Sequence, residues 1–183
     1  MPSLSKGFCV AALIPLAEVA RDAVEALLDR AFGSDRRQRT AYRIRAGMAA
    51  IPELSFAAVD PEGGLVGTIQ CWPVTLACDG GGAAAMVMVG PVAVAPERQR
   101  DGIGRALMER MLAALGESDV AGGDALMLVG DPEYYARFFG FSAQRTGGWR
   151  LPGPFEARRL LARGPGVPDC TGEVGTRTLQ AAA

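Results

Sequence analysis

The residues most able to do chemistry lie in one stretch, Val87 to Met108, which reads VMVGPVAVAPERQRDGIGRALM. An apolar run that predicts a buried strand leads into a polar loop, and a segment that predicts a helix begins at Gly102 and Gly104. Glycine leaves room for a ligand to approach backbone N–H groups closely. The first turn of a helix carries unpaired N–H donors and a partial positive charge. The stretch therefore predicts an anion site, most naturally for a phosphate or a pyrophosphate.

The same glycine pair has a second interpretation, in which it only lets a helix start close to a sheet. The stretch is not a P-loop, because the Gly-Lys-Ser/Thr end is missing. It is not a dinucleotide-binding fingerprint either, because Leu107 stands in the place of the third glycine. The anion site is favoured by the positive charge of three neighbouring residues: Arg98, Arg100 and Arg105.

The dipeptide Gly90-Pro91 interrupts the longest apolar stretch, Ala83–Ala95. Proline cannot donate a ladder hydrogen bond, so a buried strand carries it only at a bulge or at a gap between strands. Such a bulge would free the N–H and C=O groups around Val92–Val94. An extended ligand could then bind its chain along the strand and its phosphates at the helix.

Missing residue types exclude several classes of chemistry. The chain of 183 residues has no histidine, and its single lysine is Lys6. Ser-His-Asp and Cys-His nucleophile systems and His-ligated metal sites are therefore excluded, and Schiff-base chemistry loses its usual residue. The 19 Lys and Arg residues against 20 Asp and Glu residues leave a net charge of −1, a poor electrostatic footprint for a nucleic-acid binder.

The cysteines and the N-terminus predict a cytoplasmic protein. Cys9, Cys71, Cys78 and Cys170 are too widely spaced for paired zinc ligands and too few for the disulfide framework of a small secreted domain, so we expect reduced thiols. The N-terminus resembles a signal peptide only faintly, and we expect Gly7–Leu13 to form a first strand. No apolar stretch reaches the roughly 18 residues that a membrane helix needs.

Hydrophobic periodicity predicts one α/β (α+β) domain, residues 1–163, followed by a C-terminal extension, 164–183, that packs on the domain or is loosely ordered. The basic segment Ser34–Ala50 predicts a second, more exposed helix, or a helix that covers a substrate mouth. Other helices are expected at Leu16–Phe32 (ended by Gly33), Ile103–Leu115 and Pro132–Phe139. Further strands are expected at Leu54–Asp60, Leu65–Ala77, Ala85–Ala95, Ala125–Val129, Phe141–Arg145 and Phe155–Ala162.

The run GPVAVAPERQRDGIGRALM closely resembles the acetyl-CoA-binding segment of the GNAT superfamily of N-acetyltransferases, here of a bacterial branch. The family motif, Gln/Arg-x-x-Gly-x-Gly/Ala, is met by Gln99, Gly102 and Gly104. The later run DPEYYARFFGF is similar to the second family signature, a helix with a tyrosine before the Gly-Phe that opens the next strand. The resemblance implies a mixed, mostly antiparallel central sheet, splayed at a bulged strand, with helices on both faces.

The resemblance also implies the roles of particular residues toward acetyl-CoA, with no metal. Val92 and Val94 on the splayed strand would pair with the pantetheine amides, Ala93 between them would belong to the same cofactor site, and the Val94 N–H would polarise the thioester carbonyl. Tyr135 would be the general acid that protonates the departing thiolate, and Tyr134 is the alternative, because Tyr135 precedes Gly140 by five residues where the family usually has four. The pyrophosphate would be held by the backbone N–H groups of Arg100, Asp101, Gly102, Ile103, Gly104 and Arg105.

The implied reaction is direct attack of an amine, on a small molecule or a peptide, on acetyl-CoA in a ternary complex. The acceptor pocket would involve Arg36–Arg45, Glu53–Phe56 and Cys71-Trp72-Pro73, and the arginines would suit an acceptor with a carboxylate or a phosphate. The family commonly dimerises, so we expect that a homodimer can form through the C-terminal strand and tail; no membrane or nucleic-acid partner is expected. The general base stays open among four carboxylates: Glu53, Glu97, Asp131 and Glu133.

Two other classes of function remain open. A non-catalytic acyl-CoA sensor would share the loop Gln99–Gly104 but would need no tyrosine acid. An unrelated nucleotide-binding domain would bind ATP or NAD instead of CoA.

Overall fold

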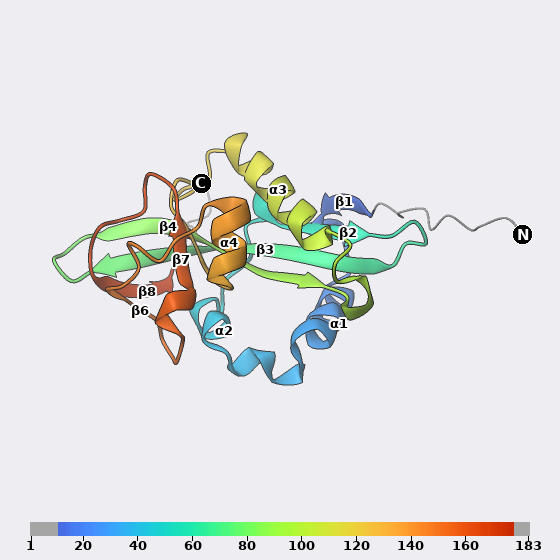
Figure 1. Cartoon of the computed structure of the whole chain (residues 1–183), viewed down its shortest axis with the longest axis horizontal. Coiled ribbons are helices and arrows are strands. Elements are labelled where there is room, and N and C mark those ends of the chain that lie inside the picture. Colours follow the sequence, from blue (N-terminus) through green and yellow to red (C-terminus); the bar gives the residue numbers. More distant parts are fainter. Residues whose placement is uncertain (1–10, 178–183) are drawn as a thin grey trace, which may run out of the picture.

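The computed structural model describes residues 11–177, and its centre is a long antiparallel hairpin (Figure 1). β3 (Leu65–Cys78) and β4 (Ala83–Val94) form this hairpin across the turn predicted by the glycines after Cys78. β4 is the strand expected from the apolar run, and its middle, Met86–Val89, is buried because layers cover both faces.

The sheet has the order β1-β2-β3-β4-β5-β7, and it is antiparallel except for two parallel pairs, β4 with β5 and β6 with β8. β2 pairs with the first half of β3, while β8 occupies the same edge along its second half and pairs in turn with β6. The expected mixed, mostly antiparallel sheet is thereby confirmed. The remaining strands are β1 (Ala12–Pro15), β2 (Phe56–Val59), β5 (Leu126–Val129), β6 (Trp149–Arg150), β7 (Leu160–Arg163) and β8 (Gly172–Thr176).

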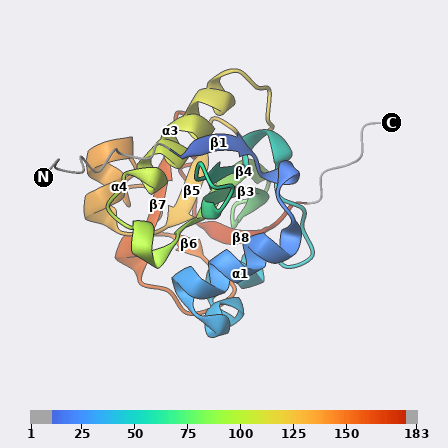
Figure 2. The same cartoon turned by 90° about the vertical axis from the view of Figure 1, so that its right-hand side faces the viewer.

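Helices cover both faces of the sheet, with α3 (Ile103–Gly116) on one face and α1 (Arg21–Phe32) on the other (Figures 1 and 2). Each helix buries one apolar stripe, as the periodicity predicts. α3 lies very close to β3 because residue 67 is a glycine, at which a Cβ would stand 2.7 Å from Ile103 Cγ2. Two shorter helices complete the fold: α2 (Thr40–Ile44) and α4 (Pro132–Phe139).

The sheet opens where β4 leaves β5. These two parallel strands pair only at Val87↔Leu126 and Met88↔Met127, whereas β5 pairs with β7 along its whole length. The register between β3 and β4 shifts between Ile69 and Cys71, opposite Gly90-Pro91, so the predicted bulge is confirmed. Beyond it, β4 continues beside β3 and away from β5.

Two predictions for the N-terminal third need correction. The strand expected at Gly7–Leu13 begins at Ala12, and residues 7–10 lie outside the described range. The helix expected from Leu16 starts at Arg21, because Val19 and Ala20 are extended (ψ 136° and 131°) between a 3-10 turn and α1.

The basic segment Ser34–Ala50 is not one exposed helix. It forms a 3-10 turn, Ser34–Gln38, and the five-residue α2, separated by the extended Arg39. Arg36 and Arg45 are buried, 1% and 6% exposed, so the segment packs on the domain instead of presenting a fully solvated charged face.

The C-terminal strands also differ from the prediction. Phe141–Arg145 contributes only an isolated bridge, Ser142↔Ala162. Phe155–Ala162 begins with a 3-10 turn, and β7 starts at Leu160. The 3-10 turn Ala157–Arg159 takes the place of the middle of the expected strand. After Arg163 the chain returns to the sheet as β8.

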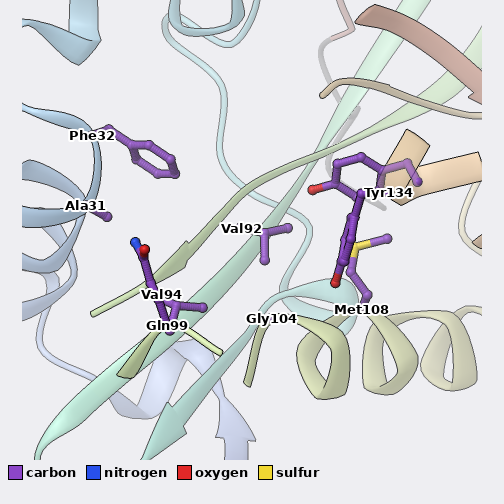
Figure 3. A pocket seen from close by; sticks show the side chains of 9 residues that line it. Ala31, Phe32, Val92, Val94, Gln99, Gly104, Met108 and Tyr134 are labelled. Carbon is purple, nitrogen blue, oxygen red and sulfur yellow. The ribbon is translucent and has the colours of Figure 1, made fainter. Parts of the chain in front are cut away.

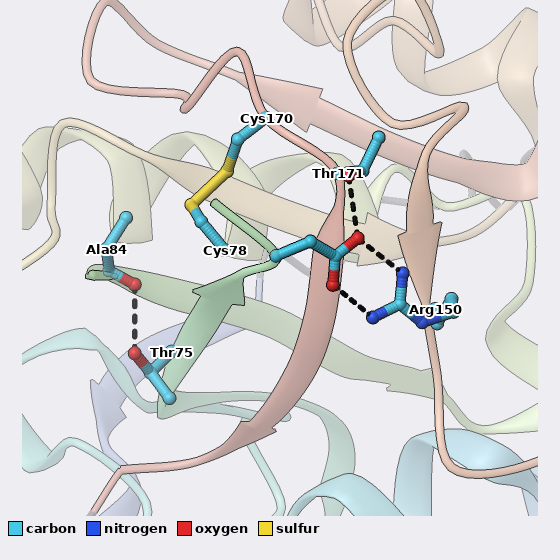
Figure 4. Close-up of a disulfide and its surroundings, with 7 residues drawn as sticks. Thr75, Cys78, Ala84, Arg150, Cys170 and Thr171 are labelled. Atoms are coloured by element: carbon cyan, nitrogen blue, oxygen red, sulfur yellow. Dashed lines mark hydrogen bonds and ion pairs between the residues drawn. A yellow bond between two sulfur atoms is a disulfide. The ribbon is translucent and has the colours of Figure 1, made fainter. Parts of the chain in front are cut away.

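The expectation of reduced thiols is wrong for two of the cysteines. Cys78, at the end of β3, and Cys170, just before β8, form a disulfide with Cα atoms 5.9 Å apart (Figure 4). The pairing of β8 with β3 brings together residues 92 positions apart, which spacing along the chain does not reveal. Beside it, Arg150 forms two hydrogen bonds with Asp79, of 2.9 and 2.6 Å. Cys71 is a buried free thiol. Among residues 11–177, no helix is both long enough and apolar enough to cross a membrane.

We predict that Cys170→Ser lowers the free energy of unfolding by about 2–4 kcal/mol, because the bond closes a long loop in the unfolded chain. Denaturant unfolding of the oxidised protein and of the variant measures this difference. As a control, dithiothreitol should destabilise the wild type and leave the variant unchanged. Equal stability of the oxidised wild type and the variant would contradict the prediction.

Candidate active site

A cavity of about 240 Å³ lies at the opening of the sheet, next to the N-terminus of α3 (Figure 3). In Figure 3, Ala31 and Phe32 of α1 reach it from one side and Tyr134 of α4 from the other, with Val92 between them. The complete lining is Ala31, Phe32, Val92, Val94, Gln99, Gly104, Met108, Tyr134 and Tyr135. The cavity thus collects residues from both sequence signatures.

The first wall is the end of β4. The Ala95 N–H donates to the Val66 carbonyl on the β3 side, at 2.9 Å. Because N–H groups alternate in direction along an antiparallel strand, the N–H groups of Val92 and Val94 point to the opposite edge. That edge is the one from which β5 has separated, so these N–H groups face the opening. Ala93 lies between them and pairs with Thr68.

The second wall is the N-terminus of α3. Gly102 caps the helix in the left-handed conformation (φ 78°), and the first backbone bond that closes the helix runs from the Ala106 N–H to the Gly102 carbonyl, at 2.9 Å. The N–H groups of Ile103, Gly104 and Arg105 therefore precede the intrahelical ladder and carry the positive end of the helix dipole.

The backbone turns sharply at Arg100, in the loop before α3. Arg100 has a positive φ of 81°, which is uncommon for a residue other than glycine. The Asp101 carboxylate accepts from Arg98 at 2.6 Å, so its charge is compensated beside the anion site. Gly104 faces β4, where a Cβ would lie 3.5 Å from Val94 and 3.8 Å from Val92.

The third wall is α4, which carries both tyrosines. Asp131 caps this helix by accepting from the N–H groups of Glu133 and Tyr134, at 2.9 and 3.3 Å, and Pro132 starts it. Tyr135 is the more deeply placed tyrosine, whereas Tyr134 is 36% exposed. The two rings meet edge to face, with centroids 5.1 Å apart.

Tyr135 keeps its proton over a wide pH range. Burial is the largest cause that raises the pKa of Tyr135, to about 12; Tyr134 and Asp131 act in the same direction, and Arg159 opposes them. The pKa of Tyr134 is also raised, first by burial, although Arg105 opposes the shift. At neutral pH each phenol is therefore a proton donor.

Sequence reasoning missed the role of Gly130, which directly follows β5. A Cβ at Gly130 would overlap the ring of Tyr135, so a glycine is required for the ring to lie against this backbone. Its position, just before the N-cap of α4, is the only signal in the sequence.

The basic segment contributes less free charge than the sequence suggests. Arg36 donates to Asp29 at 2.8 Å and to Glu25 at 2.5 Å, so its charge is compensated. Arg39 donates to the Phe32 carbonyl at 2.7 Å. Arg36 and Arg39, which were expected at the acceptor pocket, are therefore held by contacts within the domain.

Arg45 and Trp72 instead reach the bulge, a contact that sequence reasoning did not find. The Trp72 indole N–H donates to the Gly90 carbonyl at 2.9 Å, and Arg45 donates to the same oxygen at 3.4 Å. The Arg45 guanidinium lies 3.5 Å from the centroid of the Tyr42 ring. Burial lowers the pKa of Arg45.

The four carboxylates considered as general bases do not line the cavity. Glu97 pairs with Arg30 at 2.5 Å, Asp131 caps α4, and Glu133 lies 3.5 Å from Arg158. Glu53 is exposed in the 3-10 turn Pro52–Leu54. The arrangement therefore does not single out a base among them.

We predict that Gly130→Ala destabilises the protein by about 1–3 kcal/mol, because the added methyl group forces the Tyr135 ring to move. Denaturant unfolding measures the loss, and a crystal structure of the variant should show a displaced ring. Gly147→Ala is the matched control, since a Cβ there meets nothing within 4 Å. Equal stability of the two variants would contradict the role given to Gly130.

Comparison with known proteins agrees with this architecture. The chain resembles two structures over nearly the whole of both chains. One is a GNAT family N-acetyltransferase (YhbS) from Escherichia coli in complex with CoA, at 24% identity and a TM-score of 0.70, covering 96% of this chain and 94% of that one. The other is a GNAT family acetyltransferase from Brucella melitensis in complex with acetyl-CoA, at 26% identity and a TM-score of 0.63, covering 92% and 97%.

No curated protein matches the chain in sequence. The family model of the acetyltransferase (GNAT) domain matches residues 13–142, which span β1 to α4 and include every wall of the cavity. The fold is the GNAT fold, a mixed and mostly antiparallel open sheet with helices. The chain therefore belongs to the GNAT family of acetyltransferases.

Proposed function

We propose that the protein transfers an acetyl group from acetyl-CoA to an amine of a small molecule or a peptide. The observation that carries this proposal is the convergence of two sets of backbone donors on one opening. The N–H groups of Val92 and Val94 face it from β4, and those of the first turn of α3 face it from the helix. An acyl-CoA has an amide-bearing chain for the first set and a pyrophosphate for the second.

In this proposal the two sets of backbone N–H groups, on β4 and at the first turn of α3, bind acetyl-CoA. Its pantetheine extends along Val92, Ala93 and Val94, on the edge of β4 from which β5 has separated, by the same backbone pairing that adds a strand to a sheet edge. The pyrophosphate lies at the loop and first turn, Arg100–Arg105, beside Gln99. The bound CoA and acetyl-CoA named for the Escherichia coli and Brucella structures support this ligand.

Transfer is a direct attack within a ternary complex. The neutral amine forms a C–N bond with the acetyl carbon, and the C–S bond of the thioester breaks. The Val94 N–H stabilises the oxyanion that develops on the acetyl oxygen. The attacking nitrogen gives up its proton to water or to a base that is not assigned, and Tyr135 gives its proton to the departing CoA thiolate.

Alignment supplies most of the rate in this mechanism. Holding an amine and a thioester in contact contributes about 7–11 kcal/mol to lowering the barrier. The bulge that sends β4 away from β5 is therefore as important as the acid. A homodimer through the C-terminal strand remains part of the proposal.

We predict that acetyl-CoA binds at the N-terminus of α3, beside Gly104. Gly104→Val should weaken binding at least tenfold, about 1.4 kcal/mol, because a branched side chain blocks the backbone N–H groups. Isothermal titration calorimetry measures this change. Gly116→Val is the control, since it makes the same substitution at the other end of α3, where a Cβ meets nothing within 4 Å. Absence of acetyl-CoA binding to the wild type would refute the proposed function.

The second prediction concerns the acid. Tyr135→Phe should lower kcat by about 10²–10⁴-fold and leave the Kd for acetyl-CoA unchanged, because it removes only the hydroxyl. Thiol release against a panel of amines measures kcat, with Tyr134→Phe as the matched control.

The pH dependence of the same assay tests the role of the tyrosine hydroxyl. Because the pKa of Tyr135 is raised to about 12, the protonated phenol persists throughout the alkaline range up to pH 10, and no loss of rate there should come from its ionisation. An unchanged rate in Tyr135→Phe would reject this acid. Tight binding with no turnover on any amine would favour the acyl-CoA sensor.

A further inference from the structure

A second cavity, of about 570 Å³, lies along the C-terminal half of α3. Its walls come from α3, from the loop between α3 and β5, and from the end of β7 with the residues that follow it. It shares no lining residue with the cavity beside the two tyrosines. Its volume lies within the range of small-molecule sites, about 300–1,000 Å³. The function proposed above makes no use of it.

The floor of this second cavity is apolar and is held by the core. Leu126 of β5 is buried. Leu112, Leu115 and Val120 pack against the core cluster that contains it. Gly123 lets the loop lie close to α3, because a Cβ there would stand 2.8 Å from Leu115. The floor is therefore formed before any ligand arrives, as is usual for small-molecule sites.

One positive charge borders the floor. Arg163 is the last residue of β7, it is half-buried, and it pairs with Leu126 in the antiparallel ladder. Directly paired residues project from the same face of a sheet, so the Arg163 side chain lies beside that of Leu126. In the part of the chain that the structure describes, no carboxylate lies within ion-pair distance of the Arg163 guanidinium. An anionic ligand group would therefore not have to displace an ion-pair partner.

Two carboxylates border the cavity from the loop that follows α3. Asp119 and Asp124 are both exposed, and neither has a cationic side chain within ion-pair distance among residues 11–177. The Gly166 N–H donates to the Asp124 carbonyl at 2.9 Å, which fixes the backbone here. The adjacent end of α3 is the negative pole of the helix dipole, and its last turn has no basic residue to offset it. This corner therefore favours a cation.

Opposite charges that border one apolar cavity without pairing with each other suit a zwitterion with an apolar part. A guanidinium binds a carboxylate through paired hydrogen bonds, and an ammonium group donates to carboxylate oxygens. A nucleotide fits poorly, because its phosphates would meet Asp119 and Asp124. No aromatic ring is among the described residues that line the cavity, so a base would have nothing to stack on.

We propose that this cavity binds a small zwitterion with an apolar side chain, either a free amino acid or a short peptide. Its carboxylate lies on Arg163, its ammonium group lies between Asp119 and Asp124, and its side chain covers Leu115 and Leu126. The inference does not rest on the proposed function, because the two cavities have no lining residue in common.

Titration of isotope-labelled protein with L-leucine and with L-leucyl-L-leucine, followed by NMR without acetyl-CoA, tests the proposal. We expect saturable shifts of backbone amides in residues 112–126 and 163–165. Leucinamide, which lacks the carboxylate, and N-acetyl-leucine, which lacks the ammonium group, should each bind at least about tenfold more weakly than leucine. Binding of leucine alone identifies an amino acid as the ligand, and binding of the dipeptide alone identifies a peptide.

Variants assign each charge to its partner. Arg163→Gln should weaken leucine at least about tenfold and remove its advantage over leucinamide. The double variant Asp119→Asn/Asp124→Asn should remove its advantage over N-acetyl-leucine. Arg21→Gln and Asp22→Asn are the matched controls, because they make the same changes at exposed positions of α1, on the other face of the sheet, and both should bind as the wild type does. Thermal unfolding checks that each variant is folded.

The inference is overturned if neither leucine nor the dipeptide shifts the amides of this cavity, or if the Arg163 and Asp119/Asp124 variants bind both as the wild type does. Shifts confined to the surroundings of Val92 and Tyr134 would overturn it as well, and would place the zwitterion at the proposed transfer site. Failure of the proposed function looks different, because it would appear as absent acetyl-CoA binding and would leave these titrations unchanged.

Discussion

The separation of β4 from β5 after Met88 is the constraint on which the site depends. A continuous sheet would pair the N–H groups of Val92 and Val94 with a neighbouring strand and leave no edge for a ligand. Gly90-Pro91 prevents this, because proline has no N–H to donate and the register shifts at this point. Trp72 and Arg45 both donate to the Gly90 carbonyl, so side-chain hydrogen bonds as well as the backbone fix this point of β4.

Helices α3 and α4 reach this opening because glycines allow α3 and the Tyr135 ring of α4 to pack closely on the sheet. At Gly67 a side chain would push α3 away from β3 and would move its N-terminal donors out of line with β4. At Gly130 a side chain would displace the ring of Tyr135. Both glycines lie outside the Gly102-x-Gly104 motif, yet they determine whether the motif and the tyrosine face the same space.

The sequence predicted the parts that depend on local pattern. Helix α4 has the predicted bounds, and α3 differs by one residue, because apolar periodicity ends at a glycine or a proline in each case. The glycine loop and the bulge were predicted from local pattern as well, whereas both tyrosines were singled out only by the resemblance to the GNAT family. The Cys78–Cys170 bond, β8 and the contacts of Gly130 were missed, because each depends on residues that only the folded sheet brings together.

The arginines of the segment Ser34–Ala50 show why composition alone does not predict the charge that is free to bind a ligand. The arginine-rich segment predicts an exposed basic helix, but Glu25 lies within hydrogen-bond distance of both Arg36 and Arg37, and Asp29 pairs with Arg36 as well. A guanidinium that is already paired has less to offer an acidic acceptor, because a new partner must replace an existing one. Arg45 differs, since aromatic rings surround it and no carboxylate within residues 11–177 pairs with it. Any preference for an acidic acceptor at this opening therefore depends on very few of the segment's arginines. The number of arginines in the sequence does not predict that preference.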